Sequence, residues 1–322
     1  MKQMRALPFL LIILTGCGPA GESDPETLPN HSVTPKSGAQ SETGGISTTG
    51  AVQKSPDEIL ADAVKKTREG EDLEEMNVEQ LLSELLGAKN PDYNGQAQFR
   101  SERGMPVAVS LAGAGVSDIS MLEGLPLMAL DLSNNPISNL SALKGMPLRE
   151  LFLEKTRVTD LSPIKGAPLI QIFLNETRIS NIKALQGMPL KNIYLPETRV
   201  KDISPLRGMA ALEGLWLNNA PVENIEPLRG LPIVTLTLRG TAVKDISPLA
   251  TMPRLQRLHL AESRVTDLTP IAYLPLTRLL FTPDRIKKGI EAVRKMPRLK
   301  EIGDSLEGKL QPNAFWQQYD NG

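Results

Sequence analysis

An apolar pattern that returns every 21 or 22 residues is the feature that most constrains this chain of 322 residues. A period of this length means that each unit is one short coil, which buries its apolar side chains only by stacking on its neighbours. We therefore predict one repeat domain of nine units over residues 106–297, although the length alone would allow two globular domains. Pro106 starts a weaker first copy, and the equivalent positions after it are Leu127, Leu148, Leu169, Leu190, Leu212, Ile233, Leu255 and Leu276.

The unit from Leu148 to Gly166 shows what each position does, since it reads L-x-x-L-x-L-x-x-T-x-V-x-D-L-S-P-I-x-G. Leu151 and Leu153 alternate along a short strand and point into the core. The apolar residues of the second half complete the same core from the opposite side of the coil. Successive strands then stack about 4.8 Å apart into a parallel sheet.

This pattern resembles the leucine-rich repeats of bacterial proteins, in particular the short internalin-like class. The resemblance implies an α/β repeat solenoid, a horseshoe or arc with a parallel concave β-sheet, short turns or 3-10 segments on the convex side, and helical N-terminal and C-terminal caps. The family usually carries Asn at the ninth position, where its side chain bonds the backbone inside the coil. Here Asn135 is followed in that column mainly by Thr, as at Thr156, while Ala220 has no polar side chain, which puts its turn in doubt.

Residues 55–105 precede the first full unit and are predicted to form a helical and hairpin N-terminal cap. Ser55 and Asn77 each begin a helix-capping pattern that is followed by an apolar helical face. Two strands are expected over residues 97–100 and 106–111, joined by a short turn. Such a cap is needed because the first unit of a solenoid would otherwise expose its core.

The C-terminal end is predicted to close the other side of the solenoid. Apolar residues give a helical face from about Asp284 to Met296, and residues 298–322 form a C-terminal cap and tail. Three aromatic residues near the end, Phe315, Trp316 and Tyr319, are positioned to fold over the open edge of the core.

The first 17 residues are predicted to be an export signal, because a positively charged start precedes an apolar run, Leu7–Leu14, that is too short to span a bilayer. Leu14-Thr15-Gly16-Cys17 resembles the lipobox of bacterial lipoproteins, which implies that Cys17 is acylated and anchors an exported protein to the cell envelope. The same resemblance implies sorting to the outer membrane in a cell with two membranes, because Gly18 stands where the inner-membrane retention signal usually has Asp. The alternative is an ordinary secretory signal. Residues 18–54 are poor in large apolar residues and are predicted to be a disordered tether.

Two further sets of equivalent positions in the repeat could bind ions, one set a cation and the other an anion. Eight aligned Asp or Asn residues, such as Asp160 and Asn181, would suit a calcium ladder, but their position before Ser-Pro or equivalent residues favours the capping of a convex-side turn. A row of Arg157, Arg178, Arg199 and Arg264 would suit phosphate or sulfate. Ion pairs between these arginines and the nearby Glu176, Glu197 and Glu262 are the favoured interpretation.

The residue between the last two apolar positions of each strand points out of the sheet on its concave side. Four consecutive units place an aromatic residue there, and such stripes often mark an interaction site. Stacking that only stabilises the sheet is the alternative. The outward row is Ser110, Asp131, Phe152, Phe173, Tyr194, Trp216, Thr237, His259 and Leu280.

Polar residues flank this row and complete the predicted ligand-binding site. Acidic residues, Glu150 and Glu154, lie near the first units, Asn218 lies beside Trp216, and Arg239, Arg257 and Arg278 lie near the last units. An extended peptide or protein segment with a positive and a negative end suits this arrangement best. A cell-wall glycan stacked on the aromatic rings is the second possibility.

The composition argues against several other functions. A net charge of −1 argues against a nucleic-acid partner. The single Cys and two His residues leave little for a metal centre, and His259 has no partner motif for catalysis, so it is interpreted as a surface residue. We predict a non-enzymatic binding module without a cofactor. A hydrolase that uses the concave face and a purely structural envelope protein are the alternatives.

Overall fold

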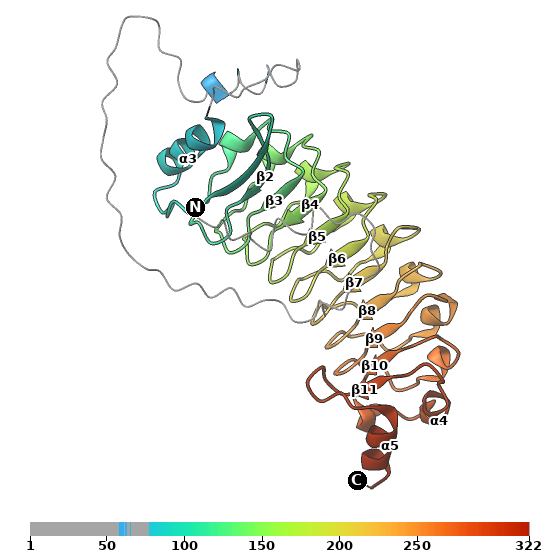
Figure 1. The fold of residues 1–322 in the computed structure, drawn as a ribbon. Helices are drawn as coiled ribbons and strands as arrows, with labels where there is room; N and C mark the ends of the chain where they lie inside the picture. The colour runs from blue at the N-terminus through green and yellow to red at the C-terminus, as the bar shows by residue number, and fades with distance from the viewer. Residues whose placement is uncertain (1–57, 61, 63–64, 66–76, 322) are drawn as a thin grey trace, which may run out of the picture. The chain divides into compact units, whose positions relative to one another are not determined.

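The computed structural model describes residues 58–60, 62, 65 and 77–321 (Figure 1). The predicted signal sequence, Cys17 and the tether over residues 18–54 lie outside the described residues, as does most of the first predicted helix. Within the described part of the chain, no helix is both long enough and apolar enough to cross a bilayer.

Eleven strands form a single sheet whose spatial order is their order in the sequence. The first pair is antiparallel and every later pair is parallel. Equivalent positions of successive units pair with each other, as Phe152 does with Phe173, which confirms the predicted solenoid (Figure 1). The strands are β1 Gln98–Glu102, β2 Met105–Ser110, β3 Ala129–Asp131, β4 Glu150–Phe152, β5 Gln171–Phe173, β6 Asn192–Tyr194, β7 Gly214–Trp216, β8 Thr235–Thr237, β9 Arg257–His259, β10 Arg278–Leu280 and β11 Glu301–Gly303.

Short 3-10 segments form the convex side of each coil, as the resemblance to leucine-rich repeats implied. In eight coils an Asp or Asn side chain accepts a hydrogen bond from the backbone N–H two residues later, at 2.7–2.8 Å, which confirms its turn-capping role. Among the described residues, no group of three or more His, Cys, Asp or Glu side chains is placed to hold a metal ion. The segments are η1 Ser120–Leu122, η2 Ser141–Leu143, η3 Ser162–Ile164, η4 Lys183–Leu185, η5 Ser204–Leu206, η6 Glu226–Leu228, η7 Ser247–Thr251, η8 Thr269–Ile271 and η9 Pro283–Arg285.

The ninth position of each coil closes a turn inside the core. The Thr156 hydroxyl donates to the Leu153 carbonyl at 2.7 Å, so Thr replaces the usual Asn. At Ala220 the same turn is closed by the backbone alone, because the Ala220 N–H donates to the Leu217 carbonyl at 3.0 Å. The expectation that this turn is in doubt was therefore wrong, since the backbone bond does not need the side chain.

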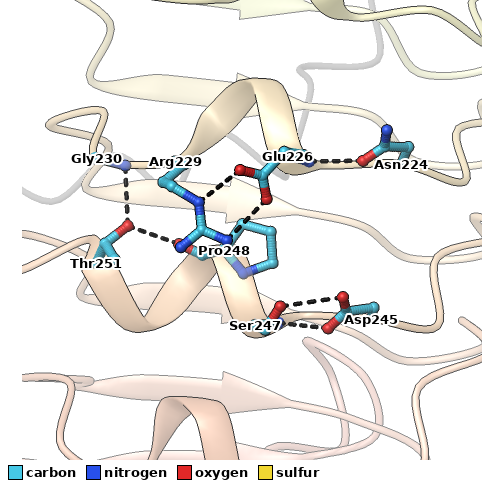
Figure 2. A network of polar contacts seen from close by, with 8 residues as sticks. All are labelled: Asn224, Glu226, Arg229, Gly230, Asp245, Ser247, Pro248 and Thr251. Atoms are coloured by element: carbon cyan, nitrogen blue, oxygen red, sulfur yellow. Dashed lines mark hydrogen bonds and ion pairs between the residues drawn. The ribbon is translucent and has the colours of Figure 1, made fainter.

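Neighbouring convex-side segments are joined by side chains (Figure 2). Within the η6 turn, Arg229 donates to both oxygens of Glu226, at 2.6 and 2.8 Å. Thr251 stands where earlier units carry a glycine such as Gly230, and η7 is correspondingly extended to five residues. The Thr251 hydroxyl accepts from the Gly230 N–H at 3.0 Å and donates to the Pro248 carbonyl at 2.9 Å, so it ties two coils together.

A helix and a hairpin cover the N-terminal end of the core. Helix α3, Val78–Lys89, is capped by Asn77, whose side chain accepts from the Gln80 N–H at 2.9 Å. The hairpin turn is tighter than predicted, because β1 continues through the expected turn and only Arg103 and Gly104 connect it to β2. Both turn residues have positive φ, 50° and 76°, which matches the twist of a two-residue hairpin.

The predicted helix from Asp284 to Met296 is broken into η9 and the short helix α4, Ile290–Arg294. Between them, the backbone of Lys287 and Lys288 bonds to Thr266 of the preceding coil, and Gly289 adopts φ 90° just before α4. A Cβ atom at this position would lie 2.5 Å from the Thr269 nitrogen, so the glycine also lets the chain pack closely on the preceding coil.

Helix α5, Pro312–Asn321, packs against the last coil. Phe315 and Trp316 are buried, and the Phe315 ring lies 5.9 Å from that of Phe281. Arg294 lies over the Trp316 ring at 4.6 Å and pairs with Asp320 at 2.7 Å, which holds α4 and α5 together.

Candidate ligand-binding face

Four aromatic rings stack face to face on the concave side of the sheet. The ring centroids of Phe152 and Phe173 are 4.4 Å apart, and those of Phe173 with Tyr194 and of Tyr194 with Trp216 are 4.1 Å apart. The planes of neighbouring rings differ by only 8–11°. In-register pairing of β4 to β7 produces this geometry, because it repeats the outward position at strand spacing.

The aromatic row is less exposed than the sequence predicts. Phe152 and Phe173 are half-buried, whereas Tyr194 and Trp216 are only 7% and 4% exposed. The stacked rings cover each other's faces, so the row is not a continuous exposed stripe. His259 is buried as well, at 5% exposed, and its interpretation as a surface residue was wrong.

Two partly buried carboxylates flank the exposed half of the row. Burial raises the pKa of Glu154 to about 7, and the nearby Asp131 carboxylate contributes to the shift. The Glu154 carboxylate accepts a hydrogen bond from Asn175 Nδ2 at 2.9 Å. Burial also raises the pKa of Glu150. Tyr194, buried and near Glu154, has its pKa raised to about 12.

The arginines predicted at the other end of the site have partners within the protein. Arg239 pairs with Glu262 at 2.7 Å. Arg278 pairs with Glu301 at 2.6 Å. Arg257 Nε donates to the Thr235 hydroxyl at 2.9 Å. The positive end of the face is therefore weaker than the sequence implies, because acids of the following coils compensate two of its charges.

Asn218 and Asn175 occupy the column two residues after the aromatic row. Asn218 is half-buried, and its Oδ1 accepts no hydrogen bond from the described residues. Asn175, which was not among the predicted site residues, is only 3% exposed, and no described residue donates to its Oδ1 either. Its position, equivalent to those of Glu154 and Asn218, was the one sequence feature that could have indicated it. Its burial could not be predicted, because it depends on the side chains of neighbouring coils.

The predicted ion pairs of the arginine row were wrong. Glu176 pairs with Lys155 at 3.3 Å, Glu197 accepts from Asn219, and Glu262 pairs with Arg239. All three acids have a left-handed backbone, with φ between 56° and 59°. Closeness in the sequence suggested that each Glu would meet the nearby Arg. The left-handed backbone at each Glu changes the direction of the chain there, which the sequence spacing does not show.

The continuous parallel sheet with a 3-10 segment on the other side of each coil defines a leucine-rich repeat solenoid. The chain is similar to an internalin, InlF, from Listeria monocytogenes, at 26% identity and a TM-score of 0.55, covering 61% of this chain and 66% of that one. It is also similar to internalin C2 from Listeria monocytogenes, at 28% identity and a TM-score of 0.55, covering 73% of this chain and 100% of that one. These likenesses support an internalin-like leucine-rich repeat and a protein-binding module. No protein-family model and no curated protein matches the chain.

Proposed function

We propose that this protein is an exported, lipid-anchored binding module that holds a protein or peptide segment on its concave face. The observation that carries the proposal is the ring stack of Phe152, Phe173, Tyr194 and Trp216. The core of each coil is already filled from the other side of the sheet, so the fold does not require large apolar side chains here. Phe152 and Phe173 remain half-exposed and are suited to anchor a ligand.

The stack favours a protein ligand over a glycan. A sugar ring binds an aromatic residue by lying on the face of its ring. With centroids 4.1–4.4 Å apart, the inner faces of these rings are covered by the next ring. Apolar side chains of a peptide, in contrast, pack well against the exposed ring edges. The edge-on geometry therefore supports a peptide or protein partner.

The test is photo-crosslinking in intact cells from a reactive amino acid at Gln171, beside the exposed rings. We expect captured partners to be lost in Phe152→Ala/Phe173→Ala and retained in Tyr273→Ala. Tyr273 follows η8 and is fully exposed, so it is a matched aromatic control. Circular dichroism verifies that each variant is folded. Equal capture by the wild type, the double variant and Tyr273→Ala would contradict the proposal. No capture by any of them would favour a structural envelope role.

The lipid anchor is proposed at Cys17 and is tested separately. Cys17→Ser is expected to move the protein from the membrane fraction to the soluble fraction and to remove the acyl mass from its N-terminus. Two or three acyl chains give stable anchoring, whereas one chain binds only marginally. A variant that stays in the membrane fraction would contradict the anchor. Separation of the inner and outer membranes, where the cell has both, tests the predicted outer-membrane location.

A further inference from the structure

Six side chains on two neighbouring strands form one continuous part of the concave face. Glu150, Phe152 and Glu154 alternate along β4 and its continuation, so all three point to the same side of the sheet. The next strand repeats this arrangement, and register places Gln171 opposite Glu150 and Phe173 opposite Phe152. We call this set the Glu-Phe-Glu patch, and its members are Glu150, Phe152, Glu154, Gln171, Phe173 and Asn175.

The two carboxylates of the patch are not directly paired with a cation, although the charges of Arg149 and Lys155 partly offset the effect of burial on their pKa values. Neither Glu150 nor Glu154 forms an ion pair with any of the residues that the structure describes. Lys155, the nearest basic residue in the sequence to Glu154, pairs instead with Glu176. Burial raises the pKa of both patch carboxyls, which means that the protein surroundings disfavour their charged forms. A cation placed beside them would relieve this cost.

Asn175 provides an independent indication of a missing donor. Its side chain is 3% exposed, and its Nδ2 donates to Glu154 Oε1 at 2.9 Å. Its Oδ1 is buried and accepts no hydrogen bond from the described residues. Buried polar atoms are nearly always hydrogen-bonded in native proteins, so an acceptor left without a donor requires an explanation. Here it lies on the same amide that contacts the Glu154 carboxylate.

We propose that the Glu-Phe-Glu patch binds an arginine side chain, flanked by apolar residues, from the segment that occupies the concave face. A guanidinium group carries five N–H donors, so it can serve the Glu154 carboxylate and Asn175 Oδ1 together. Its aliphatic stem packs on the exposed edges of Phe152 and Phe173. This inference rests on the proposed function and adds to it the chemistry of the partner.

The arginines at the other end of the concave face do not lack partners in the same way. Arg239 and Arg278 are each paired with an acid of the following coil, and Arg257 bonds the Thr235 hydroxyl. Two of these three charges are therefore compensated within the protein, and the third guanidinium already has a hydrogen-bond partner. The specificity of the face is therefore concentrated at the patch, where acceptors outnumber donors.

The test uses an array of nine-residue peptides with a central arginine between randomised apolar residues, and the same peptides with citrulline in its place. Citrulline keeps the shape of arginine and removes its charge. Fluorescence polarisation should show at least tenfold weaker binding of the citrulline peptides to the wild-type protein. Glu154→Gln should weaken the arginine peptides at least tenfold and leave the citrulline peptides unchanged. Glu123→Gln, at an exposed carboxylate outside the concave face, is the matched control and should change neither.

The outcomes separate this inference from the proposed function. Equal binding of arginine and citrulline peptides, or unchanged affinity in Glu154→Gln, would overturn the arginine site. If such peptides are still lost in Phe152→Ala/Phe173→Ala, the concave face remains the binding surface and only the arginine assignment fails. If no peptide binds the wild type more tightly than it binds that double variant, both proposals fail.

Discussion

The indole ring of Trp216 lies over the α-carbon of Gly214, two residues earlier in strand β7. A Cβ atom at position 214 would lie 2.5 Å from Trp216 Cζ3, well inside the contact distance of two carbon atoms. The glycine therefore makes the room in which the largest ring of the stack lies nearly parallel to Tyr194, at an interplanar angle of 8°. The smallest residue, Gly214, therefore makes it possible for the largest aromatic residue, Trp216, to stand two positions later in the same strand.

Gly214→Ala is expected to displace the indole and destabilise the protein by about 1–3 kcal/mol, the usual cost of overpacking. The same substitution in a Trp216→Ala background should cost less, since the ring is gone and only Asn192 Oδ1, which would lie 2.5 Å from the new Cβ atom, remains in its way. Chemical denaturation of the four proteins of this double-mutant cycle measures the difference. Equal costs in the two backgrounds would show that the ring of Trp216 is not what the glycine accommodates.

Glu154→Gln is expected to stabilise the protein above pH 7. Because burial raises the pKa of Glu154 from 4.5 to about 7, the folded state holds this proton more tightly than the unfolded state. Its contribution to the free energy of unfolding is therefore full below about pH 4.5 and declines as the pH rises to about 7. Glutamine does not ionise, so the variant should be about 1–2 kcal/mol more stable than the wild type at pH 8.

The measurement is the difference in the free energy of unfolding between the two proteins from pH 4.5 to pH 8. It should grow across this range and level off near its upper end. A difference that does not vary with pH would contradict the raised pKa. Combined with loss of arginine-peptide binding, the expected result would mean that this carboxylate is kept for recognition at a cost in stability.

Asn181→Ala is expected to destabilise the protein by about 1 kcal/mol, because it removes a turn cap. The Asn181 side chain accepts from the Lys183 N–H at 2.8 Å. Asn181→Asp is the matched control and should change little, since Asp160 and Asp202 make the same bond in the neighbouring coils. Thermal unfolding of the two variants tests this, and a loss as large in the Asp variant would contradict a capping role.

Thr177→Val is expected to destabilise the protein by about 1–2 kcal/mol. The Thr177 hydroxyl donates to the Leu174 carbonyl at 2.7 Å inside the core, and valine has nearly the same shape without the donor. Thr159→Val makes the same chemical change at an exposed position and should be nearly neutral. Urea denaturation compares them; similar midpoints would show that the side-chain bond of Thr177 contributes little to closing this turn.

The equivalent positions of successive coils show how much of the fold the sequence could predict. The period of 21 or 22 residues assigns each apolar position to the core, and the observed strands and 3-10 segments follow it coil after coil. The Asp and Asn column was interpreted correctly because a side-chain bond to the second following N–H is local in sequence. The broken helix at Gly289 was not predictable, because the chain there packs closely on Thr269, twenty residues earlier.

The sequence by itself determined the repeat, the side of the sheet to which each residue belongs, and the row in which the aromatic rings lie. These follow from the alternation of a strand and from a fixed period, both of which are local. Only the tertiary structure decided that Tyr194 and Trp216 are buried while Phe152 and Phe173 stay half-exposed. It also decided that Glu176 meets Lys155 and that Glu154 meets Asn175. Exposure and charge pairing depend on side chains that neighbouring coils bring together, and the sequence pattern of one coil does not contain that information.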